Sequence, residues 1–223
     1  MDLRPAVMFW SSGKDSAYAL ERARASGRFQ VAALLTTVSE KYGRVAIHGV
    51  REELLDLQAE AVGLPLEKIR LPTPCTNAIY ERAVEAALLP WRERGARHVV
   101  FGDLFLEDLR AYREKTLARL GMEAAFPAWR RDTRALAHEM IRGGLRAVLS
   151  CVDLQRLPAA FAGRPFDRDL LAALPEGVDP CGENGEFHTF AHAGPGFARE
   201  VPLAIGETVE REGYAFCDLR LSP

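Results

Sequence analysis

The stretch "AVMFWSSGKDSAYALERARA" (residues 6–25) decides the fold of this chain. Its first five residues are apolar and are followed by two serines, which predicts a short buried strand over 6–10. A helical pattern from 17 to 25 begins after a turn that contains Gly13 and Lys14. Such a turn presents backbone N–H groups and the positive end of the helix dipole to an anion. The stretch therefore predicts a phosphate-binding strand–turn–helix unit.

The turn differs from the two common phosphate-binding motifs. A Walker-type P-loop reads G-x-x-x-x-G-K-[ST], whereas here Asp15 follows Lys14 and the first glycine is missing; a G-x-G-x-x-G pattern is also absent. Ser12 and Asp15 have the spacing of a helix capping box, which leaves a purely structural role open. Because a cap explains neither the additional serines nor the lysine, we expect residues 11–16 to bind phosphate.

Strands alternate with helices from this unit to about residue 126. Apolar runs predict further strands at 31–38, 66–72 and 96–103, and amphipathic patterns predict helices at 49–65, 77–94 and 107–120. This alternation is typical of an α/β fold with a parallel sheet covered by helices on both faces. Ligands of such sheets bind beyond the carboxyl ends of the strands, which places 11–16 and Gly102–Asp103 at the same rim.

The pattern changes after residue 126. We expect a second, smaller domain of mixed α/β structure over 127–223, following a first domain over 1–126. Its predicted elements are helices at 132–143 and 166–174, a strand at 145–152, and strand-like alternation in the tail with turns at 194–196 and 212–213.

Composition excludes several classes of protein. The 223 residues are 48% hydrophobic and 27% charged, with a net charge of -2, so we expect no broad nucleic-acid surface. There is no apolar run of membrane-spanning length and no signal-peptide pattern at the start, which favours a cytoplasmic protein with no membrane partner. The four cysteines are far apart and form no C-x-x-C, which argues against a zinc ribbon or a thioredoxin-type motif.

Two motifs carry a resemblance to a known family. "SSGKDS" (11–16) resembles the S-G-G-x-D-S loop of the N-type ATP pyrophosphatases, with Ser12 where the first glycine usually stands. "DPCGENGEFHTF" (179–190) resembles the signature of the diphthine–ammonia ligase family, which is strongly specific. Supporting matches between them are Gly102, Arg110, Glu114, Pro127 and Trp129. The resemblance covers nearly the whole chain. It implies an adenine nucleotide alpha hydrolase-like fold with a parallel, five-stranded type of sheet, in which a nucleotide-binding domain spans 1–126 and an acceptor-binding domain spans 127–223.

The family resemblance implies an ATP-dependent amide-forming ligase. ATP would adenylate a carboxylate acceptor, on a protein side chain or a small molecule, and ammonia would then displace AMP, with pyrophosphate as the other product. Mg²⁺ on the phosphates is the implied cofactor. No glutaminase cysteine is visible, so the nitrogen donor would be free ammonia. The sequence leaves a homo-oligomer open.

The resemblance also implies roles for individual residues. The cofactor-binding set is Ser11, Ser12, Gly13, Lys14, Asp15, Ser16, Gly102, Asp103 and Arg110, with Asp15 as a metal ligand. The substrate-binding set is Gly182, Glu183, Gly185, Glu186, His188 and Thr189. The expected catalytic residues are Lys14, Asp15, Glu183, Glu186 and His188. His48 and Asn77 are further residues for the crevice, without an assigned mechanism.

Structural alternatives stay open for several of these residues. Asp15 and Asp103 also suit helix caps, and Arg110 with Glu114 suits a solvated i, i+4 ion pair. The "GENGEFHT" segment also suits a polar turn that enters a strand.

Two other functions compete with the ligase. The first is a regulatory module that binds ATP without catalysing a reaction. Proteins of that group have their glycine-rich loop after the fourth strand, whereas here it follows the first. A tRNA-modifying enzyme of the same superfamily is the other; the net charge and the cysteine spacing both argue against it.

Overall fold

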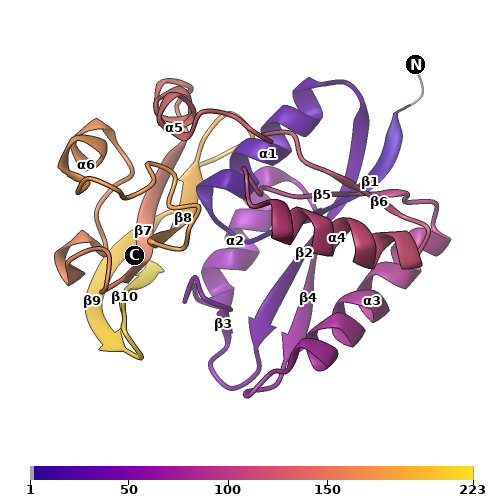
Figure 1. The fold of residues 1–223 in the computed structure, drawn as a ribbon, viewed down its shortest axis with the longest axis horizontal. Helices are drawn as coiled ribbons and strands as arrows, with labels where there is room; N and C mark the ends of the chain where they lie inside the picture. The colour runs from indigo at the N-terminus through magenta and orange to yellow at the C-terminus, as the bar shows by residue number, and fades with distance from the viewer. Residues whose placement is uncertain (1–2, 223) are drawn as a thin grey trace.

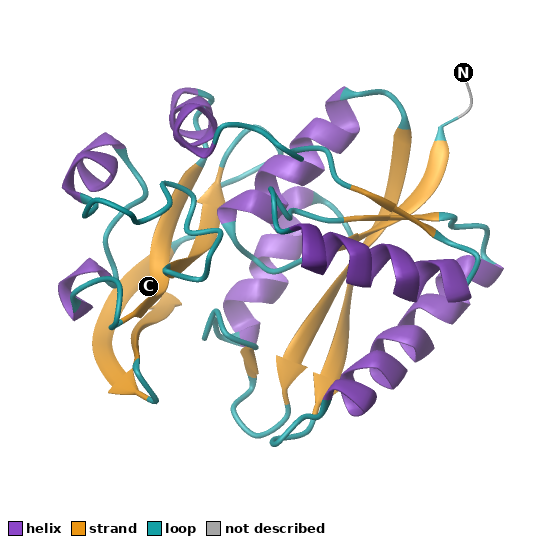
Figure 2. Cartoon of the chain, viewed as in Figure 1, coloured by secondary structure: helices purple, strands orange, loops and turns teal. Residues whose placement is uncertain are grey.

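The computed structural model describes residues 3–222, which form two β-sheets with helices around them (Figures 1 and 2). The first part of the chain contains β1 (Arg4–Phe9), α1 (Lys14–Ala25), β2 (Phe29–Ser39), β3 (Arg44–Val45), α2 (Glu52–Val62), β4 (Leu66–Leu71), α3 (Asn77–Glu93), β5 (His98–Val100), α4 (Glu107–Arg119) and β6 (Glu123–Ala125). The second part contains α5 (Thr133–Arg142), β7 (Arg146–Asp153), the 3₁₀ helix η1 (Ala159–Phe161), α6 (Arg168–Ala173), β8 (Phe187–Ala193), β9 (Leu203–Arg211) and β10 (Tyr214–Leu221).

The first sheet, sheet A, has five parallel strands in the order β4-β2-β1-β5-β6. The short strand β3 runs antiparallel to the end of β2, where Val38 is opposite Val45. The parallel α/β prediction is confirmed. Sequence periodicity did not find β3 and β6, because strands of two and three residues are too short to show an alternating pattern.

Helices cover both faces of sheet A. Successive residues of β1 point to opposite faces, so Val7 packs with α3 and α4, whereas Ala6 and Met8 pack with α1 and α2. Because both faces are buried, β1 is apolar without alternation. In Figure 1, α1 and α2 lie between sheet A and the second sheet.

The second sheet, sheet B, is antiparallel, with the order β8-β7-β10-β9. Together with α5 and α6 it confirms the expected mixed α/β structure; α6 lies on the side of sheet B that faces away from sheet A (Figure 1). One hydrophobic cluster joins Met8 and Leu54 to Phe187 and Phe190 of β8. The division at residue 126 stays a prediction.

Helix α1 begins at Lys14, three residues earlier than expected, so Lys14 and Asp15 lie in its first turn. The N-cap residue is Gly13, and no side chain caps it within the helix. Ser12 precedes the N-cap in the left-handed region, with a φ of 70°, and its hydroxyl makes no hydrogen bond to the described residues. The capping-box interpretation of Ser12 and Asp15 is therefore wrong.

Over residues 3–222, none of the helices combines the length and the apolar character that a membrane-spanning segment needs.

Candidate active site

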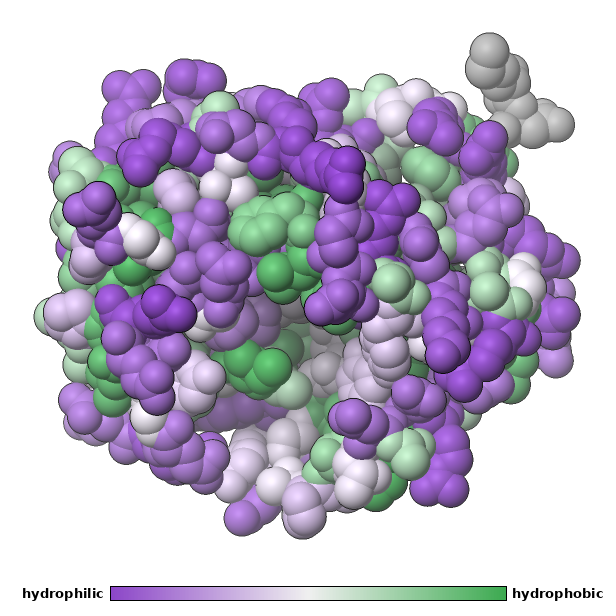
Figure 3. Space-filling view, viewed as in Figure 1, coloured by the Kyte–Doolittle hydropathy of each residue, from purple (hydrophilic) through white to green (hydrophobic). Residues whose placement is uncertain are grey.

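The strand order of sheet A reverses between β1 and β5. The chain passes from β1 to β2 and β4 on one side, and then crosses through α3 to β5 on the other side of β1. A crevice opens at such a switch point, beyond the carboxyl ends of the two strands. Residues 11–16 follow β1 and Gly102–Asp103 follow β5, so both segments meet there as expected. The molecular surface is hollowed between the two sheets (Figure 3).

Gly102 allows the two segments to touch. A Cβ atom at this position would lie 2.8 Å from the backbone nitrogen of Ser16 and 2.9 Å from the carbonyl carbon of Asp15. Both neighbours are backbone atoms of the first turn of α1 and have little freedom to move. Only glycine therefore fits where the end of β5 contacts the N-terminus of α1.

The loop over 11–16 is closed by its own serines. The hydroxyls of Ser11 and Ser16 are 2.8 Å apart, and the backbone N–H groups of Ser11 and Gly13 donate to these two oxygens over 3.2 and 3.3 Å. The hydroxyl of Ser12 is buried without a partner among the described residues. The loop thus holds its backbone in a fixed shape at the positive end of the α1 dipole, which suits a phosphate group.

Gln58 supports the loop from α2 and is not among the site residues predicted from the sequence. This fully buried amide accepts a hydrogen bond from the Trp10 indole over 2.7 Å. Its Nε2 donates to the carbonyl oxygens of Ser12 and Ala191 over 2.9 and 2.6 Å. The available signal was a glutamine on the apolar face of α2, where a polar residue needs buried partners.

Lys14 is buried and points toward sheet B. Its Nζ donates to Asp15 Oδ2 over 2.9 Å and to the carbonyl oxygen of Cys181, and it lies 5.3 and 5.2 Å from the ring centres of Phe166 and Phe187. Burial lowers the pKa of Lys14, but Asp15, Cys181 and Glu183 together outweigh burial and raise that pKa. The lysine therefore remains charged and connects the loop over 11–16 to the 179–190 segment.

Asp15 keeps one oxygen free of protein contacts. Oδ2 is paired with Lys14, whereas Oδ1 is buried without a partner among residues 3–222. Burial raises the pKa of the Asp15 carboxyl, and Lys14 opposes that effect. Mg²⁺ in nucleotide sites needs only one or two carboxylates besides phosphate oxygens and water, so the free Oδ1 fits this ion. Within the described residues there is no group of three or more potential metal ligands.

Glu183 links the 179–190 segment to the loop after β5. Its Oε1 accepts hydrogen bonds from the backbone N–H groups of Leu104, over 2.7 Å, and Phe105, over 3.4 Å. Burial and the nearby Asp15 raise the pKa of Glu183 to about 7. A carboxyl with such a pKa is suited to exchange a proton near neutral pH.

Glu186 shapes the turn of this segment. Its buried carboxylate accepts from the backbone nitrogens of Asp179 and Asn184, both over 3.0 Å, and from Asn184 Nδ2 over 3.1 Å. Gly182 and Gly185 have φ values of 67° and 87°, which favour glycine. The structure gives Glu186 contacts within the turn, and its expected contact with substrate stays a prediction.

Thr189 and His188 bring β8 to the loop. Thr189 Oγ1 accepts the backbone N–H of Lys14 over 3.0 Å, so sheet B caps α1. The His188 ring lies 4.7 Å, centre to centre, from that of His48, whose Nδ1 is 3.1 Å from the carbonyl oxygen of Thr189. His48 therefore does lie at the crevice, whereas Asn77 is exposed in the first turn of α3.

Asp103 is held by an ion pair. Arg113 Nε and Nη2 donate to its two carboxylate oxygens over 2.5 and 3.2 Å. The N-cap of α4 is Leu106, so the capping interpretation of Asp103 is wrong.

Arg110 forms the expected i, i+4 pair with Glu114, over 2.8 Å. Its guanidinium also lies over the rings of Phe126 and Trp129, 5.3 and 4.8 Å from their centres. These contacts leave its expected role toward the nucleotide a prediction.

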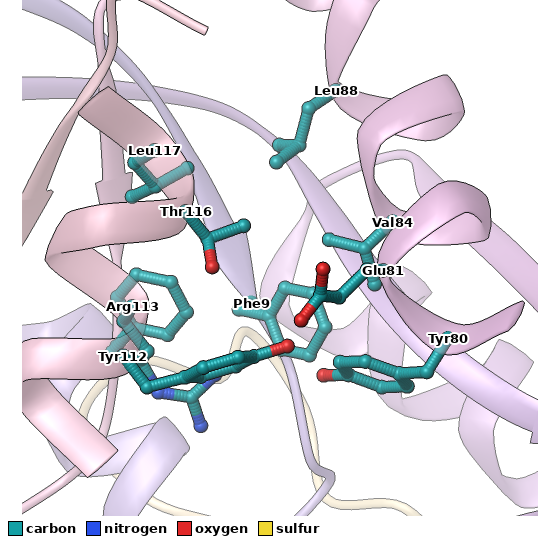
Figure 4. Close-up of a pocket in the computed structure, with 10 residues that line it drawn as sticks. Phe9, Tyr80, Glu81, Val84, Leu88, Tyr112, Arg113, Thr116 and Leu117 are labelled. Atoms are coloured by element: carbon teal, nitrogen blue, oxygen red, sulfur yellow. The ribbon is translucent and has the colours of Figure 1, made fainter. Parts of the chain in front are cut away.

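A separate cavity lies between α3 and α4 (Figure 4). Its volume is about 20 Å³, and Tyr80, Arg113 and Thr116 are among the residues that line it. That space holds roughly one water molecule. The cavity is therefore too small for a nucleotide.

Comparison with known proteins gives consistent matches. The family model of the diphthamide synthase N-terminal domain matches residues 4–124. The chain is 29% identical over 233 residues to the diphthine–ammonia ligase of Danio rerio, covering 92% of this chain and 89% of that protein. It is 28% identical to the diphthine–ammonia ligase of Bos taurus, covering 92% and 85%, and 27% identical to that of Schizosaccharomyces pombe, covering 95% of this chain and 38% of that protein.

Proposed function

Because this chain belongs to the diphthamide synthase N-terminal domain family, we propose that it converts the carboxylate of diphthine, or of a similar acceptor, into an amide with ATP and ammonia. It is an ATP-dependent carbon–nitrogen ligase. In the proposed reaction the carboxylate is first adenylated, and AMP and pyrophosphate are the products.

The observation that carries this proposal is the junction between the two motifs. Lys14 lies in the loop that suits phosphate and contacts Cys181 and Thr189 of the 179–190 segment through its side chain and its backbone N–H. A group transfer from ATP to an acceptor needs both binding regions within reach of one another. The contacts of Lys14 support a single site that spans both.

Adenylation explains the need for ATP. A carboxylate resists attack by ammonia because it is negatively charged and its leaving group is poor. One carboxylate oxygen attacks the α-phosphorus of ATP, the bond to the bridging oxygen breaks, and pyrophosphate leaves with the electron pair. Residues 11–16 hold the β- and γ-phosphates through backbone N–H groups and hydroxyls, with the α1 dipole behind them.

Mg²⁺ would be held by Asp15 together with the phosphates of ATP. The ion would neutralise part of the charge on the departing pyrophosphate. The free, buried Oδ1 of Asp15 supports this assignment. Lys14 holds the other oxygen of Asp15 and so fixes the direction in which Oδ1 points.

The acceptor side is assigned to the 179–190 segment. Glu183 takes the proton that ammonium or the attacking nitrogen must lose, because its pKa of about 7 suits a general base at neutral pH. His188 and Thr189 belong to the same acceptor side of the proposed site. Glu186 acts by holding the turn that presents Glu183, which makes it a positioning residue.

The cysteines weigh against tRNA thiolation as an alternative. Cys151, Cys181 and Cys217 are buried free thiols, and burial raises the pKa of Cys151 to about 12 and also raises the pKa of Cys181 and Cys217. Such thiols are poor nucleophiles near neutral pH. Only Cys75 is exposed, so no reactive pair is available.

The test is a product analysis. The chain is incubated with ATP, MgCl₂, ammonium chloride and a translation factor that carries diphthine, and nucleotides and modified peptide are measured. We expect AMP, pyrophosphate and the amide in equal amounts. Formation of ADP and phosphate would contradict adenylation, and tight ATP binding without turnover would support the regulatory module instead.

A further inference from the structure

Two histidines from different parts of the fold form a ring pair beside the loop over 11–16. His48 follows β3, His188 belongs to β8, and their ring centres are 4.7 Å apart with an angle of 41° between the planes. The Cε1 atom of His48 would lie 3.0 Å from a Cβ atom added to Gly13. The pair is therefore packed directly against the loop and is part of the wall of the crevice.

The hydrogen bond of His48 determines its tautomer. Nδ1 is 3.1 Å from the carbonyl oxygen of Thr189, which can only accept, so Nδ1 carries the proton of the neutral ring. Nε2 is then left with a lone pair. Both histidines are half-buried, so their side chains are not fully enclosed by protein.

The surroundings keep both rings neutral. Burial lowers the pKa of His48 to about 4 and the pKa of His188 well below its usual value, and the positive charge of Lys14 acts in the same direction. A neutral imidazole nitrogen with a lone pair accepts a hydrogen bond. Nε2 of His48 therefore suits a small N–H donor and is unsuited to an oxygen of phosphate or of a carboxylate.

We propose that the His48–His188 pair is the ammonia subsite of this chain, in which Nε2 of His48 accepts an N–H of ammonia. The inference rests on the proposed ligase function. Held in this way, ammonia keeps its nitrogen lone pair free to attack the acyl carbon of the adenylate. The new C–N bond forms as the bond from carbon to the AMP oxygen breaks, AMP leaves with that electron pair, and one proton of the nitrogen is lost to Glu183.

His48→Asn is the most direct variant. The asparagine amide can still donate to Thr189 O, as Nδ1 does, but it lacks an acceptor at the Nε2 position. Loss of one such hydrogen bond should raise the KM for ammonium about tenfold. The KM for ATP, and the kcat at saturating ammonium, should remain within about a factor of two, as a role in ammonia binding alone requires.

A matched control and a second variant complete the experiment. The control is His192→Asn. His192 lies on β8 like His188, but its ring pairs with Glu200 and has no part in the His48–His188 pair. This variant should leave the KM for ammonium unchanged. His188→Asn should raise the KM for ammonium as His48→Asn does. ATP–pyrophosphate exchange with the acceptor, which needs no ammonia, checks that each variant is folded and active in the first step.

The outcomes separate this inference from the proposed function. An unchanged KM for ammonium in both pair variants would overturn the ammonia subsite and leave the ligase in place. If the KM for ATP increased instead, the pair would belong to the nucleotide site, which would also overturn the ammonia subsite. If the wild-type chain makes no amide from ammonium, the proposed function fails, and the subsite fails with it.

Discussion

Replacing Ser12 by glycine should make the protein more stable and its nucleotide binding weaker. Ser12 has a φ of 70°, a conformation that costs a residue with a Cβ atom about 1–2 kcal/mol. Its buried hydroxyl has no partner among the described residues, which costs about 1–3 kcal/mol more. The greater freedom of glycine in the unfolded chain offsets about 0.5–1 kcal/mol. We expect a net gain of about 1–4 kcal/mol in the free energy of unfolding.

Two assays check this prediction. For a chain of this size the gain corresponds to a Tm increase of about 3–12 °C in thermal denaturation. If the hydroxyl is unpaired because it serves the phosphates, calorimetry with ATP should show an affinity about tenfold weaker. Ser150→Ala is a matched control, because Ser150 also has a buried, unpaired hydroxyl but lies on β7; it should gain stability without any change in ATP affinity.

A lower Tm for Ser12→Gly would refute the strain and burial argument. Unchanged ATP affinity would remove Ser12 from the phosphate site. The two results are independent of each other, because Tm reports on the strain and burial at Ser12 and calorimetry on its contact with phosphate.

Three further variants test other parts of the site. Lys14→Met should lower the free energy of unfolding by about 3 kcal/mol in urea titrations, because Asp15 would be left buried without its partner, and it should abolish ATP turnover. Glu183→Gln should remove a pH-dependent loss of stability: the wild type becomes less stable as pH rises from about 4.5 to 7, because its folded state binds the Glu183 proton more tightly than the unfolded chain does. Relative to pH 5, the free energy of unfolding of the variant should exceed that of the wild type by about 2 kcal/mol at pH 8. Equal slopes of stability against pH in the two proteins would contradict the raised pKa. Gly102→Ala should destabilise the protein by about 1–3 kcal/mol, because the added methyl meets backbone atoms of α1; a wild-type Tm would show that β5 and α1 can separate.

The sequence was sufficient for the larger architecture, because long elements have clear periodicity. The apolar run of β1, the turn after it and the amphipathic α2 together predicted the parallel sheet and the rim where residues 11–16 meet Gly102. The short strands β3 and β6 were missed because they depend on pairing with β2 and β5 rather than on their own pattern.

Local sequence did not predict which partners the site residues find. Ser12 and Asp15 have capping-box spacing, yet the left-handed backbone at Ser12 moves the cap to Gly13, and Thr189 from a distant strand supplies the capping oxygen. Lys14 was expected to face phosphate. Its contact with the carbonyl oxygen of Cys181 joins positions 167 residues apart, which no local pattern encodes.

The central claim is that residues 11–16 bind the polyphosphate of ATP. A crystal structure with a non-hydrolysable ATP analogue tests it most directly. The claim predicts phosphate oxygens within hydrogen-bonding distance of the backbone N–H groups and hydroxyls of this loop, with the α-phosphate facing the 179–190 segment. An analogue bound elsewhere, with the loop unchanged and without contacts to it, would contradict the claim.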